Sequence, residues 1–312
     1  MGVKNNLKII FMGTPSFAVP ALKKISEKHQ VVLVVTREDK RQGRGKKLAK
    51  PEIKICAEAL GLEVYQPEKI NSKESIEKLK SMNADLIVVA AYGKILKDEI
   101  LKLTGDNPVN IHASLLPKLR GAAPINRAII NGDEFAGVSI MKIEEGLDTG
   151  DYCFQDKTPI KNKNIDELTE ELGQMGADLI VKFLEDYEKN NIKWIKQEDS
   201  KATYAPKIEK EEGFIDFKKM TADEIERLSR ALFDKPGISF NYDGNRIKIS
   251  DLEVLNMEGK AGQVISNEGQ LIIMTKDKAI KINKIQWPGK KMMNTEDFLR
   301  GRNIEKDKII GG

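Results

Sequence analysis

The stretch DLIVVAA, from Asp85 to Ala91, decides the fold class of this 312-residue chain. Its apolar run is unbroken and lacks the polar alternation of a strand that has one face in solvent. Similar Val- and Ile-rich runs are separated by segments with helical spacing, and they occur at Leu7–Met12, Val31–Val35, Val109–His112 and Val138–Ile143. Such strands are typical of parallel sheets covered on both sides. We therefore predict an α/β fold with a Rossmann-like, mostly parallel sheet and helices on both faces.

The last third of the chain has a different pattern. Short β segments separated by turn dipeptides such as Asp243-Gly244 follow Pro236-Gly237. Their number and spacing predict a small C-terminal β-barrel, with an OB-like barrel as the leading candidate. The polar stretch Glu188–Lys210 shows little periodicity and is interpreted as a linker. The expected division is a catalytic domain at 1–189, a linker at 190–207 and a barrel-like domain at 208–312.

Composition narrows the function classes. The formal net charge is only +4, with 52 Lys and Arg against 48 Asp and Glu, which argues against a protein that binds polyanions through bulk charge. The two cysteines are far apart and form no C-x-x-C pair, so neither a disulfide framework nor a zinc site is predicted. The apolar run near the N-terminus is too short for a bilayer span and lacks a cleavage site. We expect a soluble, cytoplasmic protein with no membrane partner.

Asn110 and His112 lie two residues apart where a predicted strand ends. Side chains alternate along a strand, so these two point the same way, roughly 7 Å apart. Ligands of parallel sheets bind beyond the carboxyl ends of the strands, which is where this pair lies. An imidazole there serves equally well as a buried structural group or as a catalytic one. The Asn110 amide favours catalysis, because it can donate hydrogen bonds to a developing oxyanion. The other histidine, His29, is predicted to lie solvated at the end of a surface helix.

The loop from Glu144 to Asp151 places acidic residues among glycines just after a strand. Asp148 in this loop can orient an imidazole and raise its basicity. The spacing does not fit an EF-hand, so we expect no metal. Ser114 is a poor nucleophile candidate because it enters a Leu-Leu-Pro turn. Without a serine or cysteine nucleophile beside His112, direct attack by a substrate amine on an acyl carbon is the favoured reaction class. Gly13-Thr14-Pro15 does not match a dinucleotide fingerprint, and no phosphate-binding P-loop occurs.

A basic stretch runs from Arg37 to Lys50, with seven Lys or Arg residues against two acidic ones. Charge runs are usually solvated faces. Here the glycines of Gly43-Arg44-Gly45 allow the backbone to come close to a binding partner. The stretch also follows the second predicted strand, on the side of the sheet where ligands bind. An anionic partner is therefore the better interpretation, and contacts to a phosphate backbone would account for so many cations.

Three motifs together resemble the folate-dependent formyltransferase family. They are Asn110-x-His112, the loop from Ser114 to Pro124, and Gly146-Leu-Asp148-Thr-Gly150-Asp151. The resemblance covers about Leu7 to Leu299, and the basic stretch with the C-terminal barrel narrows it to the members that act on tRNA. It implies an enzyme that transfers the formyl group of 10-formyltetrahydrofolate to the α-amino group of methionine on initiator tRNA, for translation initiation.

The resemblance also implies roles for individual residues. It implies a catalytic trio of Asn110, His112 and Asp148. The positions that match the family's folate contacts are Ser114, Leu115, Leu116, Pro117, Tyr92, Gly93, Glu144 and Leu147. The positions that match its tRNA-binding loop are Arg41, Arg44, Lys46 and Lys47. Co-substrate and tRNA are the expected partners, no metal is expected, and the chain is expected to work as a monomer.

Two other functions compete with this one. A sibling formyltransferase or a formyl-folate hydrolase would use the same trio on a small amine, a nucleotide sugar or water. The basic stretch and the barrel argue against it, since a small acceptor needs neither. An RNA-binding protein with an inert catalytic half is the second rival, and the intact trio argues against it.

Overall fold

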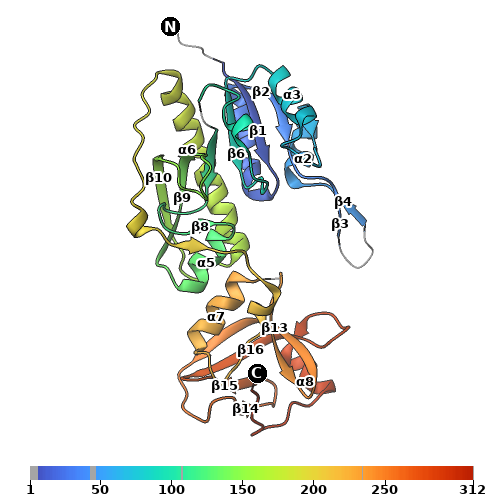
Figure 1. Ribbon diagram of the computed structural model, residues 1–312. Helices are drawn as coiled ribbons and strands as arrows, with labels where there is room; N and C mark the ends of the chain where they lie inside the picture. Colours follow the sequence, from blue (N-terminus) through green and yellow to red (C-terminus); the bar gives the residue numbers. More distant parts are fainter. Residues whose placement is uncertain (1–5, 43–46, 107, 234, 312) are drawn as a thin grey trace. The chain divides into compact units, whose positions relative to one another are not determined.

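The computed structural model describes residues 6–42, 47–106, 108–233 and 235–311 (Figure 1). The chain divides into two compact units, which are described separately. Unit 1 comprises Met1–Pro124, Phe135–Pro159 and Glu167–Pro206, and unit 2 comprises Ile125–Glu134, Ile160–Asp166 and Lys207–Gly312. No helix in the described residues is both long enough and apolar enough to cross a membrane.

Unit 1 is built on a sheet that has seven strands within the described residues, in the order β10-β9-β7-β6-β1-β2-β5. Their bounds are β1 (Lys8–Gly13), β2 (Gln30–Val35), β5 (Val64–Tyr65), β6 (Leu86–Ala90), β7 (Val109–His112), β9 (Phe135–Lys142) and β10 (Tyr152–Pro159). The neighbouring strands β7, β6, β1, β2 and β5 run parallel to one another. The strand β9 is antiparallel to both of its neighbours, β7 and β10. The predicted mostly parallel sheet is thus confirmed, with an antiparallel edge added.

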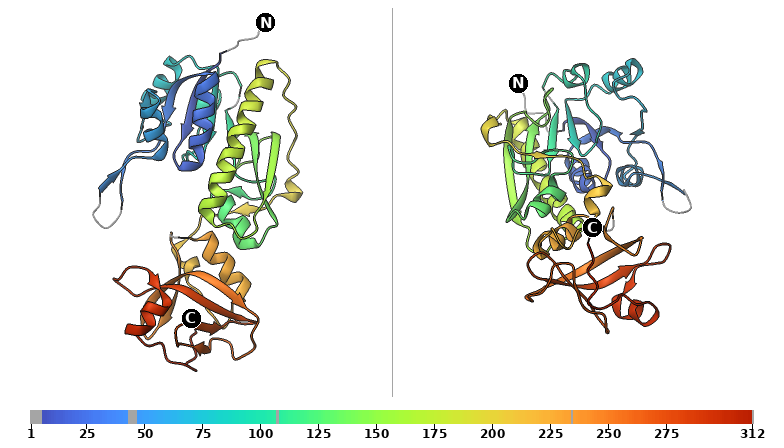
Figure 2. Two further views of the ribbon diagram at one scale, coloured as in Figure 1. Left: turned by 180° about the vertical axis from the view of Figure 1, so that it is seen from behind. Right: turned by 60° about the horizontal axis from the view of Figure 1, so that its bottom comes forward.

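Helices cover both faces of this sheet (Figures 1 and 2). On one face, the apolar side chains of β1 and β6 pack against α3 (Lys73–Ser81) and α4 (Asp98–Leu101). The other face carries α1 (Val19–Lys28), α2 (Glu52–Ala59) and α6 (Ile165–Glu188). Gly176 lets α6 approach β7 closely, because a Cβ there would lie 2.6 Å from Cγ2 of Ile111. The strand β7, which carries Asn110 and His112, is therefore held in place by direct packing against α6.

Two segments of unit 1 differ from expectation. The strand β10 was not predicted, because its sequence YCFQDKTP is polar and half exposed and gives no apolar run. His29 is buried, with 9% of its surface exposed, and its Nδ1 accepts a hydrogen bond from the Leu7 N–H at 3.4 Å. The solvated-surface interpretation of His29 is thus wrong, because Leu7, just before β1, and Glu188, at the end of α6, lie against the ring.

The polar stretch after α6 folds onto unit 1. Ile195 forms a β-bridge with Tyr152, and the short strand β11 (Tyr204–Ala205) pairs with β8 (Arg120–Gly121). Arg120 N donates to the Thr203 carbonyl at 2.9 Å. Long-range pairing with the loop after β7 thus supplies the backbone hydrogen bonds that this stretch lacks locally.

Unit 2 contains an antiparallel sheet that curves into a half-barrel, with the described strands in the order β12-β13-β16-β15-β14 and β17 paired to β16. The bounds are β12 (Ile238–Tyr242), β13 (Asn245–Leu255), β14 (Val264–Ser266), β15 (Leu271–Met274), β16 (Ala279–Gln286) and β17 (Met293–Asn294). The helices α5 (Pro124–Asn131), α7 (Ala222–Ala231) and α8 (Thr295–Gly301) complete the fold, and α7 begins with the Thr221–Glu224 capping box. The predicted small β domain is confirmed.

Candidate active site

The candidate site lies at the carboxyl end of β7, in the middle of the sheet. Asn110 faces Val89 on β6 and Met141 on β9, and His112 lies opposite Ser139. The side chain of His112 is buried, whereas Asn110 is half buried. Within the described part of the chain the Asn110 amide has no hydrogen-bond partner, so both of its N–H groups are free for a ligand.

The His112 ring is held on both sides. Its Nε2 lies 3.1 Å from the Leu119 carbonyl, and its Nδ1 lies 3.7 Å from Oδ2 of Asp148. A carbonyl oxygen can only accept a hydrogen bond, so Nε2 of His112 carries a hydrogen and donates a hydrogen bond to the Leu119 carbonyl. Nδ1 is then the atom that remains to take up a proton, and the Asp148 carboxylate stands beside it to stabilise the resulting imidazolium.

Asp148 itself is fixed by backbone groups. Its Oδ2 accepts the Gly121 N–H at 2.7 Å, and its φ of +51° is unusual for a residue other than glycine. Gly121 has a φ of +122°, and a Cβ there would lie 2.8 Å from the Ala205 carbonyl oxygen. The sequence RGAAP, with β11 alongside, thus places a backbone donor where only glycine fits.

The residues expected to contact folate occupy three loops, whose side chains have few free polar groups. The buried Ser114 hydroxyl donates to the Lys118 carbonyl at 2.6 Å, and Ser139 Oγ donates to the Ser114 carbonyl at 2.6 Å. Leu116 is buried, and Leu115 and Pro117 are half buried. Ser114 therefore stabilises the loop that passes the site, and its hydroxyl is already engaged.

The loop after β6 is held by burial of Tyr92 and by side-chain hydrogen bonds to its carbonyls. The Tyr92 ring is buried in the core, and burial raises the pKa of its hydroxyl to about 12. The Tyr92 carbonyl accepts from Arg37 Nε at 3.1 Å and from Thr14 Oγ1 at 3.2 Å, and Gly93 O also accepts from Arg37. Across the site, Glu144 is exposed and Leu147 is 61% exposed. Leu147 thus presents an apolar surface beside Asp148.

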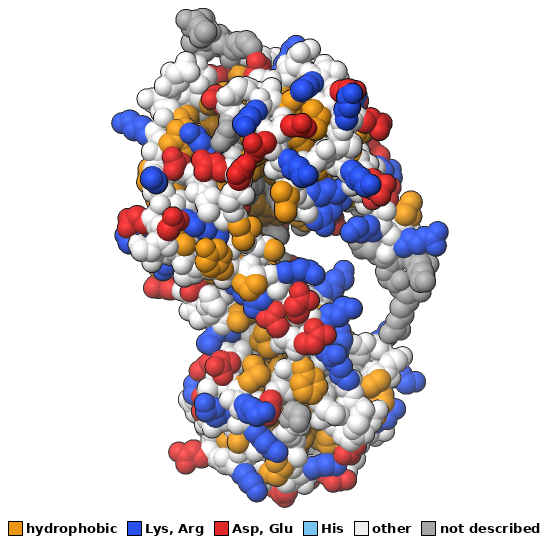
Figure 3. Space-filling view, in the orientation of Figure 1, with side chains coloured by type: hydrophobic (Ala, Val, Ile, Leu, Met, Phe, Trp, Pro, Cys, Tyr) orange, Lys and Arg blue, Asp and Glu red, His pale blue; other side chains and the backbone are white. Residues whose placement is uncertain are grey.

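The basic stretch contains a hairpin formed by β3 (Lys40–Gln42) and β4 (Lys47–Ala49). Arg41 is exposed on it. Arg44 and Lys46 lie outside the described residues, and of Lys47 only the backbone pairing is described. The base of the hairpin is anchored by Asp39, which bonds Lys54 at 2.8 Å and Gln66 at 2.8 Å. On the face drawn in Figure 3, Lys and Arg are mixed with Asp and Glu over both units.

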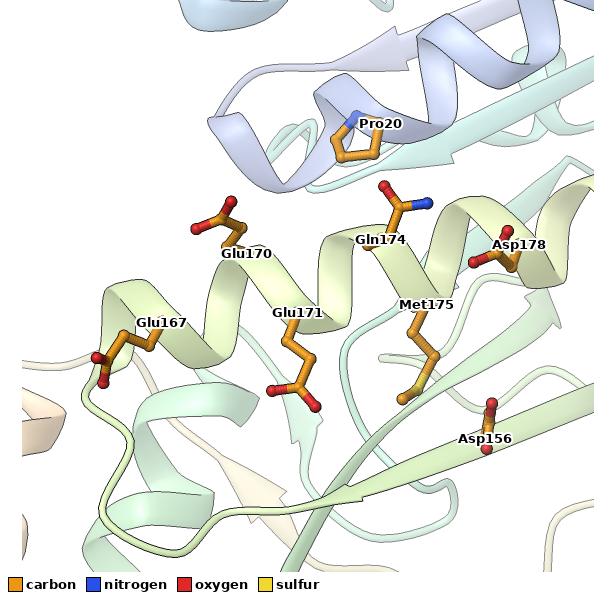
Figure 4. Close-up of a pocket in the computed structure, with 8 residues that line it drawn as sticks. All are labelled: Pro20, Asp156, Glu167, Glu170, Glu171, Gln174, Met175 and Asp178. Carbon is orange, nitrogen blue, oxygen red and sulfur yellow. The ribbon is translucent and has the colours of Figure 1, made fainter.

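One hollow of about 660 Å³ lies away from this site, between α6 and the neighbouring α1 and β10 (Figure 4). Its lining is mostly acidic and comprises Pro20, Asp156, Glu167, Glu170, Glu171, Gln174, Met175 and Asp178. Such a lining repels phosphates and carboxylates. We therefore do not place folate or tRNA there. In the described residues no group of three His, Cys, Asp or Glu side chains is arranged to hold a metal ion.

Two residues near Asp148 were missed by the sequence analysis. Gln197 is 6% exposed and donates from Nε2 to the carbonyls of Asp148 and Gly150, and Arg120 is 2% exposed and donates to Gln197. Arg120 lies within the Ser114–Pro124 loop, which is one of the three motifs that carry the family resemblance. Gln197 lies in the polar stretch 190–207, whose composition gave no signal.

Comparison with known proteins identifies the family. The Formyl transferase family matches residues 7–184, and the Formyl transferase C-terminal domain matches residues 207–303. A methionyl-tRNA formyltransferase of Caldanaerobacter subterraneus subsp. tengcongensis is 41% identical over 309 residues, which cover 97% of this chain and 100% of that protein. The chain belongs to the methionyl-tRNA formyltransferase family. The resemblance inferred from the motifs is confirmed.

Other relatives agree with this assignment. A methionyl-tRNA formyltransferase of Clostridium acetobutylicum is 43% identical over 310 residues, covering 97% of this chain and 99% of that protein. The crystal structure of HypX from Aquifex aeolicus in complex with tetrahydrofolic acid matches with a TM-score of 0.67 at 18% identity. That match covers 94% of this chain but only 47% of HypX. At this identity the similarity shows a shared fold.

Proposed function

We propose that this chain transfers the formyl group of 10-formyltetrahydrofolate to the α-amino group of methionine on initiator tRNA, with Asn110, His112 and Asp148 as the catalytic residues. Membership of the methionyl-tRNA formyltransferases assigns formyl transfer to methionyl-tRNA. The observation that carries the residue roles is the His112–Asp148 contact of 3.7 Å beside the unpartnered Asn110 amide, in the described part of the chain.

The geometry supports addition of the amine to the formyl carbon followed by elimination of the folate nitrogen. The methionine amine attacks the formyl carbon, and a new N–C bond forms while the carbonyl oxygen becomes an oxyanion. Asn110 donates to this oxyanion, which is the charge that builds up in the transition state. His112 Nδ1 takes the proton that the amine loses, with Asp148 beside it. The oxyanion then re-forms the carbonyl as the bond from carbon to N10 breaks, and His112 passes the amine's proton to N10 of the departing folate.

Folate is proposed to bind along the loops that surround these residues. The carbonyls of the Ser114–Pro117 loop and of the Tyr92-Gly93 turn are already hydrogen-bonded within the protein, so these loops are proposed to bound the folate by their shape, and Leu147 offers an apolar contact. Glu144, at the exposed end of its loop, is proposed to lie beside the pterin. A flat heterocycle suits such a lining, because apolar side chains bury its faces while a small number of polar groups fix its orientation.

The acceptor tRNA is proposed to contact the β3–β4 hairpin through Arg41, Arg44, Lys46 and Lys47. The mixed charge of the surface in Figure 3 favours local contacts over binding through bulk charge. We further propose that residues 1–189 carry the chemistry and that residues 208–312 contact tRNA, with 190–207 between them. The chain is proposed to act as a monomer in the cytoplasm.

The test is formyl transfer from 10-formyltetrahydrofolate with three acceptors in parallel: methionine-charged initiator tRNA, free methionine and buffer alone. Formylation confined to the charged tRNA is the expected result. Folate turnover without tRNA formylation would assign the site to a sibling transferase or hydrolase. Absence of any turnover by correctly folded wild-type protein would contradict a catalytic role for the trio.

A further inference from the structure

Asp148 is connected through a buried chain of hydrogen bonds to the polar stretch that follows α6. The guanidinium of Arg120 donates from Nε to Gln197 Oε1 at 3.0 Å and from Nη2 to Asp199 Oδ1 at 2.9 Å. Gln197 in turn donates from Nε2 to the carbonyls of Asp148 at 2.8 Å and Gly150 at 2.6 Å. All of these groups lie in unit 1.

The orientation of the Gln197 amide is determined by its partners. A guanidinium has donors only, so Oε1 of Gln197 must face Arg120 and Nε2 must face the two carbonyls. Arg120 is 2% exposed, and a buried charged group without hydrogen-bond partners is energetically costly. The hydrogen bond from Arg120 to Gln197 is therefore expected to persist. Asp199, by contrast, has an 85% exposed side chain and its ion pair with Arg120 contributes little.

The two carbonyls that Gln197 holds belong to the turn that places the Asp148 carboxylate. Asp148 has a left-handed backbone with φ +51°, which surrounding contacts must maintain. Gly150 lies so close to Lys142 that a Cβ would be 2.2 Å from its carbonyl oxygen. One amide thus ties both carbonyls of a strained turn, while the side chain of Asp148 reaches Gly121 N–H and His112.

We propose that Gln197, oriented by Arg120, is a positioning residue for Asp148, holding the 148–150 turn so that the carboxylate stays beside His112 Nδ1. The inference rests on the proposed function, because it assumes that Asp148 acts in catalysis. It assigns to the polar stretch after α6 a task in the reaction. A displacement of about 1 Å in a catalytic group can cost roughly 10²-fold in rate.

The main test is a double-mutant cycle between Gln197→Leu and Asp148→Asn, measured as single-turnover formylation of charged initiator tRNA, with the KM for tRNA taken from steady-state runs. Gln197→Leu alone is expected to lower the rate by about 10²-fold while the KM for tRNA stays unchanged. In the Asp148→Asn background the same substitution should change the rate less than about threefold, because the group that it positions is already gone. Glu198→Ala, an exposed neighbour in the same segment, is the matched control and should behave as wild type.

Conservative variants separate positioning from simple structural support. Gln197→Glu keeps an oxygen for Arg120 but loses both donors to the turn, so the rate should still fall. Arg120→Lys keeps a donor toward Gln197 and should recover part of the activity that Arg120→Met loses. If Gln197→Leu does not fold, as judged by circular dichroism, the Gln197→Glu variant decides: a slow enzyme with an unchanged Tm supports the proposal, and full activity overturns it.

The failures are distinguishable. Equal losses from Gln197→Leu with and without Asp148→Asn would overturn the positioning role and leave Gln197 as a structural residue. A wild-type rate for Asp148→Asn would instead refute the catalytic role of Asp148 under the proposed function. A large rise in the tRNA KM with an unchanged rate would also overturn the proposal, because it would place the effect on binding.

Discussion

Replacing Asn110 by alanine separates transition-state stabilisation from folding with unusual clarity in this chain. The amide has no hydrogen-bond partner within the described residues, so its loss strands no buried group. The free energy of unfolding should therefore change by less than about 1 kcal/mol. If the amide is an oxyanion donor, the barrier should rise by about 2.7–4 kcal/mol, which is roughly 10²–10³-fold in kcat.

The assay is steady-state formylation of charged initiator tRNA with both substrates saturating, together with urea unfolding of each variant. Asn191→Ala, an exposed asparagine in the same unit, is the control and should retain wild-type kcat. The loss should appear in kcat and kcat/KM alike, because the donor acts only once the oxyanion forms. A kcat within threefold of wild type would refute the oxyanion role, and so would a loss confined to KM.

Three further perturbations test other parts of the molecule. Gly121→Ala should lower the free energy of unfolding in urea by about 1–3 kcal/mol and should slow formylation. The reason is that φ of Gly121 is +122° and the new Cβ would meet the Ala205 carbonyl, so unchanged stability would contradict this expectation. Burial lowers the pKa of His29, so the unfolded state binds protons more readily and the unfolding free energy should fall as the pH drops below 6.5. His29→Gln should flatten that dependence in urea titrations from pH 7.5 to 5, and an unaltered slope would exclude His29 as its source. Arg41→Ala should weaken tRNA binding and reduce the salt slope of log K by about 1, whereas an unchanged slope in filter binding would remove Arg41 from the interface.

The sequence by itself determined the family and the strands of the unit 1 sheet other than β10. Runs such as Leu86–Ala90 are apolar throughout, and an unbroken apolar run needs no partner to be recognised as a buried strand. The short strands of unit 2 and the helix that begins at the Thr221 capping box could also be predicted from the sequence, because turn dipeptides and capping residues act locally. The spacing of Asn110 and His112 placed both side chains on one side of a strand end without reference to any other segment.

Only the tertiary structure decided which distant groups complete the site. Gln197 bonds carbonyls 49 and 47 residues away, and Arg120 bonds Gln197 across 77 residues. The strand β10, the burial of His29 and the pairing of β11 with β8 likewise depend on partners far along the chain. Local patterns report the propensity of a segment, whereas a polar stretch with no period of its own is ordered by hydrogen bonds that other segments supply. For this reason a stretch interpreted as a linker holds the backbone of Asp148.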